Sequence, residues 1–237
     1  MRLSSALSRF RSTRLVLVPL IVFIIAAATS CDGAGTPADS EELLRSIALD
    51  QNDVGAAYAL DSERAQTNEQ AALARADTEQ AREQYKDWGQ LLAYNVQFAP
   101  PPSSDLVFSG RTARIMNTVT LFDDDDGGAA SLDYLVSLSE QRIADVLHND
   151  GAGTRLDEIQ VQKDLEFPPS GDQSFAWRFS GKATFETGLT SAFVADSVFV
   201  RVGRVTGNVT TVALGSAPPR DELEALVRRF VEKSSNQ

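Results

Sequence analysis

The sequence predicts an α+β domain: an antiparallel sheet of about five to seven strands with helices packed on one face. Several segments alternate apolar and polar residues and are joined by short turns, and short turns connect antiparallel strands because parallel pairing needs long crossovers. Two other segments, residues 128–148 and 220–233, space their apolar residues as a helix does. The alternation leaves one face of the sheet buried and the other wetter. We therefore expect both helices on the buried face.

The first half of the domain is expected to contain both helices and strands. Ser40 can cap a short helix, and residues 68–86 are rich in the strong helix formers Ala, Glu, Gln and Arg. That second helix has few large apolar residues and is expected to be largely exposed; a coiled coil is the alternative, although its heptad is not sustained. In chain order, the expected elements are helix 41–49, strand 56–67, helix 68–86, strand 94–98, strand 113–122 and helix 128–148.

The second half is expected to be mainly β-structure. Alternating apolar residues mark strands at 156–167, 174–181, 195–205 and 208–214. Thr206-Gly207-Asn208 separates the last two and is typical of a hairpin turn. The closing segment has proline at its start and apolar residues at i, i+3, i+4, i+7 and i+8, which predicts a helix over 220–233.

The first thirty residues have the organisation of a secretory signal. Residues 1–14 carry four arginines and no acid, and residues 15–29 are apolar apart from the final threonine. The apolar run is about 15 residues, whereas a helix that spans a bilayer needs roughly 20. The sequence DGAGTPAD that follows Cys31 reads as a flexible tether. We therefore divide the chain into a signal peptide (1–30), a tether (31–39) and one globular domain (40–237).

Cys31 is the single cysteine, so no disulfide can form within the chain. Ala28-Thr29-Ser30-Cys31 resembles the lipobox of bacterial lipoproteins, in which small or aliphatic residues precede an invariant cysteine. The resemblance implies cleavage before Cys31 and a diacylglycerol thioether on its sulfur, with acyl chains such as palmitate as the membrane anchor. Two or three such chains anchor stably. The alternatives are an uncleaved transmembrane anchor and simple secretion.

The charge of the chain excludes one class of partner. Without the four leader arginines, 18 basic residues stand against 33 acidic ones, a net charge of −15. Such a surface repels nucleic acid phosphates, so DNA or RNA binding is not expected. A solvated acidic exterior is the simplest explanation of this charge.

Three segments of the domain resemble uncharacterised lipoproteins of actinobacterial and chloroflexus-type bacteria. They also resemble the extracellular sensor domains of mycobacterial serine/threonine kinases. The segments are Asp87-Trp88-Gly89, VTLFDDDDGGAASLDYL (119–135) and VFVRVGRVTGNVTTVAL (198–214). The resemblance implies a ligand-sensing or surface-binding module. It supplies no catalytic residues.

Four aromatic residues are candidates for the lining of a ligand pocket between sheet and helices: Trp88, Phe175, Trp177 and Phe179. The alternative is that they are ordinary core residues. The run Asp123–Asp126 does not match a calcium loop, because position 12 is Tyr134 and not a glutamate. It is better explained by the favourable interaction of acids with the start of a helix. No cofactor or metal site is expected.

These observations favour a lipid-anchored module outside the cytoplasm that binds or senses a ligand without catalysis. A small molecule or an envelope protein would be its partner. A structural or interaction lipoprotein of the envelope that presents its acidic face or the 68–86 helix is the first alternative. An unrecognised carboxylate-based hydrolase is the second, because acid–base pairs need only be close in space.

The lipobox interpretation predicts that Cys31→Ala, or treatment of the host with globomycin, leaves the unprocessed precursor, because the signal peptidase acts only on the lipid-modified cysteine. Immunoblotting and mass spectrometry of the membrane fraction would show the larger, unlipidated chain. Thr29→Ala is the matched control, since a small residue remains there and processing should be normal. Normal processing of the Cys31→Ala chain would contradict the interpretation.

Overall fold

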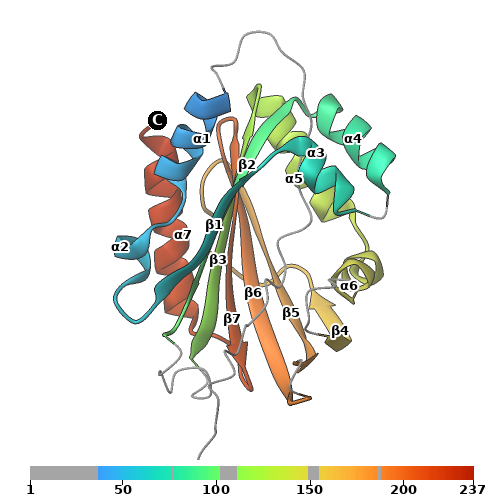
Figure 1. The fold of residues 1–237 in the computed structure, drawn as a ribbon, viewed down its shortest axis with the longest axis vertical. Helices are drawn as coiled ribbons and strands as arrows, with labels where there is room; N and C mark the ends of the chain where they lie inside the picture. The colour runs from blue at the N-terminus through green and yellow to red at the C-terminus, as the bar shows by residue number, and fades with distance from the viewer. Residues whose placement is uncertain (1–36, 76, 102–110, 149–154, 186–187) are drawn as a thin grey trace, which may run out of the picture.

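Seven antiparallel strands form one sheet in the order β1-β2-β3-β7-β6-β5-β4 (Figure 1). The structure, a computed structural model, describes residues 37–75, 77–101, 111–148, 155–185 and 188–237; the predicted signal peptide and Cys31 lie outside these residues. The strands are β1 (Ala59–Gln66), β2 (Gln90–Ala99), β3 (Thr112–Phe122), β4 (Arg155–Gln162), β5 (Gln173–Thr184), β6 (Thr190–Val202) and β7 (Val205–Leu214). The helices are α1 (Pro37–Ile47), α2 (Gln51–Val54), α3 (Asn68–Leu73), α4 (Thr78–Asp87), α5 (Asp125–Ser137), α6 (Glu140–His148) and α7 (Arg220–Ser235). The α+β class and the antiparallel sheet are confirmed.

The expectation that the two long helical segments share one face is wrong. Helix α7 packs with α1 on one side of the sheet, and α5 and α6 lie on the other (Figure 1). The reason is that β6 buries large side chains on both of its sides: Val198 and Val200 contact the α7 side, whereas Phe199 contacts the α5 side. Both apolar surfaces must be covered to be removed from water.

Two of the predicted helices are each divided in two. Residues 68–86 form α3 and α4, and the segment between them contains Arg75, which donates two hydrogen bonds to the Asp77 carboxylate. The expected helix 128–148 ends at Ser137, because Leu138 takes an extended ψ of 138°. The hydroxyl of Ser139 then accepts from the backbone N–H of Arg142 at the start of α6. Ser and Asp favour such positions because their oxygens satisfy the first free N–H groups of a helix.

The hairpin between β6 and β7 turns at Gly203-Arg204, and the predicted turn at Thr206-Gly207-Asn208 is therefore wrong. Gly203 has a φ of +55°, which glycine adopts without strain. Gly207 instead lies inside β7, where the ring of Phe230 from α7 rests on it; a Cβ atom there would come within 2.1 Å of Phe230 Cζ. The glycine in the strand therefore makes room for an aromatic ring of the covering helix.

A second glycine sets how closely α5 approaches the loop before β2. Asp124 caps α5, because its carboxylate accepts from the Gly127 N–H at 2.8 Å. A Cβ atom on Gly127 would lie 1.9 Å from the carbonyl oxygen of Trp88, whereas one on Gly128 would make only ordinary contacts at 3.4 Å and beyond. The acidic run thus serves to start a helix, as expected, and the first glycine after it permits close packing.

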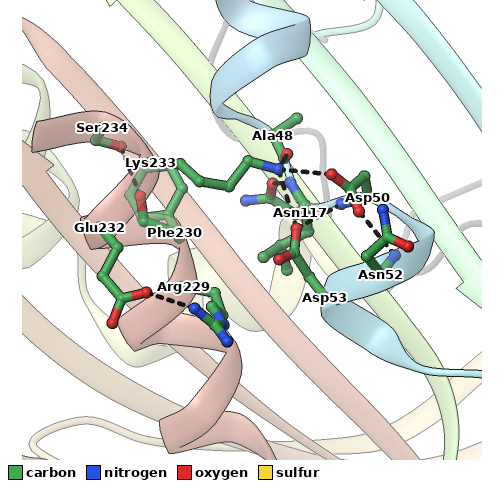
Figure 2. Close-up of polar contacts among 11 residues, drawn as sticks. Ala48, Asp50, Asn52, Asp53, Asn117, Arg229, Phe230, Glu232, Lys233 and Ser234 are labelled. Carbon is green, nitrogen blue, oxygen red and sulfur yellow. Dashed lines mark hydrogen bonds and ion pairs between the residues drawn. The ribbon is translucent and has the colours of Figure 1, made fainter. Parts of the chain in front are cut away.

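Lys233 joins the last helix to the start of the domain. Figure 2 shows its ammonium group between the α1–α2 junction and α2. The Nζ atom donates to the carbonyl of Ala48 at 2.6 Å and to the carboxylates of Asp50 and Asp53 at 3.1 and 3.0 Å. On the same helix, Arg229 pairs with Glu232, three residues further along, and both side chains are largely exposed. Lys233 therefore makes the tertiary contact and Arg229 a local one.

Asn117 of β3 fixes the same junction from inside the core. Its side chain is completely buried. Its Oδ1 accepts from the N–H of Leu49 at 2.9 Å, and its Nδ2 donates to the carbonyl of Asn208 at 3.1 Å. A buried amide is costly unless its donor and acceptor are both used. Asn117 meets that condition by holding the chain between α1 and α2 against the central strands.

Gly127→Ala is expected to destabilise the domain by about 1–3 kcal/mol, because the new methyl group must displace the Trp88 backbone. Gly128→Ala, one residue further along the same helix, is the matched control. It should be neutral or stabilising by up to about 1 kcal/mol, because alanine favours helix over glycine. Urea unfolding of the two variants would measure the difference. Equal stability of the two would show that α5 does not approach Trp88 as described.

Lys233→Met is expected to destabilise the domain by about 1 kcal/mol near neutral pH, a small value because Asp50 is half-exposed. Burial acts to raise the pKa of Asp50, but hydrogen bonds from Lys233 and the Asn52 N–H outweigh it and lower the pKa. A lowered pKa in the folded state gives stability that is present above about pH 4 and is lost as the pH falls through the folded pKa.

The difference in unfolding free energy between wild type and Lys233→Met should therefore narrow below about pH 4. Arg229→Met is the control and should change stability by less than about 0.5 kcal/mol at either pH, because its ion pair is solvent-exposed. Chemical denaturation across this pH range measures both. A difference that does not depend on pH would contradict the role given to Asp50.

Candidate functional site: a polar face of the sheet

The side of the sheet that faces α5 carries polar side chains in register across its central strands. We call these residues the polar rows. Directly opposite residues of antiparallel strands point to the same side, so the pairing defines each row. The rows are Gln66, Ala93, Thr120, Thr206 and Arg201; Arg64, Asn95, Thr118 and Asn208; and Gln97, Met116, Thr210 and Ser197. Gly128 of α5 lies over Arg201 and Thr206, which places α5 on this side.

Hydrogen bonds connect the polar rows from strand to strand. Thr118 donates to Asn95 Oδ1 at 2.8 Å, and Asn95 Nδ2 donates to Gln66 Oε1 at 3.2 Å. On the other side of β3, the hydroxyls of Ser197 and Thr210 are 2.6 Å apart, and Thr210 donates to Asn208 Oδ1 at 2.8 Å. The partners are uncharged amides and hydroxyls, each of which can both donate and accept. Between the arginines at their ends, the rows thus hold neutral groups at positions fixed by the strands.

The middle row remains the most accessible of the three. Arg64 on the edge strand β1 is exposed and Asn208 is half-buried, while Asn95 and Thr118 between them are 5% and 8% exposed. Polar side chains at such low exposure lose water and need partners. The row therefore runs from solvent at the sheet edge into a nearly dry part of the face.

Arg114 lies at one end of the polar rows. Its guanidinium group is 2% exposed, donates to Gln97 Oε1 at 2.5 Å and lies 3.2 Å from the carboxylate of Asp61. Burial lowers the pKa of Arg114, and the nearby charge of Asp61 opposes this only in part. Taking a guanidinium group out of water is costly, and the contacts with Gln97 and Asp61 offset part of that cost.

An aromatic cluster adjoins the polar rows on β5 and β6. Phe175 continues the middle row, because it pairs with Phe199, which pairs with Asn208. The Phe175 and Phe199 rings are stacked with centroids 4.8 Å apart and an angle of 18° between planes. Trp177 and Phe179 are fully buried in the core under α5 and α6, whereas Phe175 is partly exposed. Of these three candidates, Phe175 is the one whose ring can meet a ligand without displacing the core.

Trp88 lies apart from this cluster. It ends α4 and contacts the rings of Tyr85 and Tyr134, at centroid distances of 6.0 and 5.4 Å. It packs against a small alanine-rich group between α3, α4 and β2. The four aromatic residues singled out from the sequence therefore do not surround one common pocket in the described part of the chain. That they contact a ligand stays a prediction.

Phe175 also lines an open cavity of about 390 Å³ at the start of β5. The rest of its lining comes from the segment between β4 and β5, which includes Asp164, Phe167 and Ser170. Asp164 has a φ of +58°, a left-handed conformation that is uncommon for a residue other than glycine. The cavity lining thus brings the Phe175 end of the middle row together with the segment between β4 and β5.

Among the described residues, no three His, Cys, Asp or Glu side chains come together in a way that could hold a metal ion. None of the described helices combines the length and apolarity that crossing a bilayer requires.

The polar rows were missed from the sequence, although a signal was present. In TARIMNTVTLF the apolar residues of β3 attract attention, while Thr118 and Thr120 alternate with them at the same period of two. Threonine is common in strands for its branched Cβ alone, so one such strand means little. The informative signal is that polar and apolar residues also alternate in NVQ of β2 and in GNVTT of β7. These two strands lie on either side of β3 only in the folded sheet.

No family model matches the chain, and no curated protein matches it. Among solved structures, the chain is similar to the extracellular domain of PknH from Mycobacterium tuberculosis, with a TM-score of 0.49 and 12% sequence identity. The match covers 83% of this chain and 97% of that one. The sequence resemblance had named the extracellular sensor domains of mycobacterial serine/threonine kinases, and this neighbour is the extracellular domain of a mycobacterial protein.

Proposed function

We propose that the protein is a lipid-anchored module outside the cytoplasm that binds or senses a ligand without catalysis, and that the ligand lies on the polar rows. The observation that carries the proposal is the register of Asn95, Thr118 and Asn208 on three adjacent strands. A sheet face that serves only to pack against helices would be expected to be apolar, as the opposite face is.

The chemistry of the face favours binding over catalysis. General acid–base catalysis needs a group that gains or loses a proton near the working pH. The polar rows offer amides, hydroxyls and arginines, which do not titrate there. Such groups can orient a ligand through many hydrogen bonds. This supports a binding or sensing role, because the residues that make up the polar rows include no carboxylate for the hydrolase alternative.

The location is supported by the sequence. The basic and apolar leader and the lipobox-like Ala28-Thr29-Ser30-Cys31 favour export and lipidation at Cys31. The last three residues of the expected tether (31–39) form the first turn of α1, which begins at Pro37. The first described helix, α1, would therefore stand close to the membrane. Molecules of the envelope or the medium would then meet the middle row at its exposed end, Arg64, and at the half-buried Asn208.

The proposal predicts that at least one class of small molecule stabilises the full chain in detergent. A thermal-shift panel of neutral oligosaccharides, phosphorylated anions, polyamines and fatty acids would test it. A ligand at about 100 times its Kd should raise the melting temperature by roughly 5 °C. Thr118→Val, which removes a hydroxyl at nearly constant shape, should reduce that shift.

Thr211→Val is the matched control for this experiment. Thr211 is completely buried on β7 and points to the α7 side, where its Oγ1 has no hydrogen-bond partner among the described residues. Its removal should leave the ligand-induced shift unchanged. Absence of a shift with every class of compound, or an equal loss in both threonine variants, would contradict binding on the polar rows and leave an interaction lipoprotein as the better explanation.

A further inference from the structure

We propose that the open cavity at the start of β5 binds an organic cation, an ammonium group carried on an apolar body. The site uses none of the amides and hydroxyls of the polar rows, and the inference does not depend on the function proposed for them. It follows from the accessibility of the cavity, from the sign of the charges around it and from the aromatic rings in its lining.

The lining of the cavity is within reach of a ligand. Its volume of about 390 Å³ falls within the roughly 300–1,000 Å³ that is typical of sites for small molecules. Of the lining residues, which the structure describes in full, Ala176 alone is buried, and the others are exposed or half-buried. A ligand can therefore meet these groups without moving any helix or strand.

The charged side chains in the lining are all acidic. They are Asp164, Glu166 and Asp172, and the described lining includes no lysine or arginine. Asp172 is already engaged, because its carboxylate accepts from the Gly203 N–H at 2.7 Å and lies 3.5 Å from Arg201. In the described part of the chain, no hydrogen bond or ion pair engages the carboxylates of Asp164 and Glu166. These two acids are therefore available to a ligand.

The basic side chains next to the cavity are engaged by other groups. Lys163 donates to backbone carbonyls at the end of α5, among them that of Leu138 at 2.9 Å. Arg220 pairs with the carboxylate of Glu224 at 3.0 Å and donates to the backbone carbonyl of Glu166. The negative charge of the lining is thus not fully matched, in a protein whose charge without the leader is −15. Such a potential attracts cations and repels anions.

Glu166 is turned toward the side of the sheet on which Phe175 lies. The segment runs beside β5, since the N–H of Leu165 donates to the carbonyl of Ala176 at 2.9 Å. Leu165 and Phe167, on either side of Glu166, pack against the core cluster under α7, whereas Glu166 is exposed. Side chains alternate along an extended segment. A carboxylate and an aromatic ring therefore lie on the same side of the cavity.

The aromatic rings in the lining favour an organic cation over a hydrated metal ion. Phe175 is partly exposed, and its ring is held in place by stacking on Phe199 with centroids 4.8 Å apart. Such a ring attracts an ammonium group and also packs against an apolar ligand body. The same segment already holds one organic cation in this way, because the guanidinium group of Arg220 lies 4.9 Å from the centroid of the Phe167 ring.

NMR titration of the isotope-labelled full chain with benzylamine, in an uncharged detergent, tests the inference. Benzylamine is expected to shift the amide signals of residues 164–176 with a Kd on the order of 1 mM, as suits a ligand of this size. Benzyl alcohol has the same shape without the charge and should bind at least about fivefold more weakly. Benzoate, which carries the opposite charge, should not bind.

The ammonium group occurs both in free amines and in the lysine side chains of peptides. A titration with N-acetyl-lysine methylamide separates these two sources. Tighter binding of the lysine compound would assign the site to a peptide, and tighter binding of benzylamine would assign it to a free amine. Either result supports an organic cation as the ligand.

Two substitutions remove the available charges at nearly constant shape. They are Glu166→Gln and Asp164→Asn, and asparagine tolerates the left-handed backbone of residue 164. Each should weaken benzylamine binding about threefold, and the double variant about tenfold. Glu83→Gln is the matched control, because Glu83 is exposed on α4, outside the cavity lining, and its loss changes the net charge equally. It should bind benzylamine as the wild type does.

Four results would each overturn the inference. Equal affinity for benzylamine and benzyl alcohol would show that charge plays no part, and equal weakening by Glu83→Gln would show an effect of net charge alone. Signal shifts confined to residues outside 164–176 would place the ligand elsewhere. Absence of binding by both ammonium compounds would leave the cavity without the proposed ligand. Amide spectra of the variants without ligand show that the fold is kept, as expected for substitutions of exposed side chains.

Discussion

The register of the central strands decides what each face of the sheet can do. Side chains alternate across a strand, so a shift of one residue would exchange the two faces completely. In β3 the odd positions Ile115 and Val119 are buried under α1 and α7, and the even positions Thr118 and Thr120 belong to the polar rows. The same division holds in β7, where Val209 and Thr210 point to opposite sides. Core and candidate binding face are therefore specified by one alignment of strands.

Asn117 is an informative polar residue on the apolar face. It lies among valines and isoleucine, yet it is a polar residue without exposure. Its two hydrogen bonds go to backbone groups, the N–H of Leu49 and the carbonyl of Asn208. It therefore marks the point at which the N-terminal segment crosses the sheet, and a misaligned β3 would lose these bonds together with the apolar packing. A single buried amide can in this way favour one register over its neighbours.

The sequence predicts the class of the fold and most of its strands. Apolar residues recur every two positions in a strand and about every 3.6 in a helix, and both patterns can be read within a short segment. It does not predict the helix breaks at Arg75–Asp77 and Leu138, since those depend on caps and on the docking of short helices. The predicted position of the β6–β7 hairpin turn was wrong because it, too, depends on a distant contact. Thr206-Gly207-Asn208 has turn composition, but Gly207 is needed in the strand because of Phe230, a residue more than twenty positions away.

The candidate site was less predictable than the fold. The sequence identifies the aromatic residues, but it does not show whether a ring is buried, because that depends on which helices cover it. Phe175 is partly exposed, whereas Trp177, two residues later, is almost completely buried. The polar rows arise only when β2, β3 and β7 become neighbours, although β7 follows β3 by more than eighty residues. Long-range pairing of this kind leaves no contiguous motif.

The contacts of Lys233 have a mechanical consequence. The chain enters the described fold at α1, and α7 brings the C-terminus back to the same end of the molecule (Figure 1). Tension applied ahead of Pro37 would be carried along α1 to its junction with α2, where Lys233 and Asn117 hold the backbone from two sides (Figure 2). The load would thus pass to the last helix and to the middle of the sheet at once. Unfolding that starts from the N-terminal side and passes beyond α1 would therefore have to break these contacts.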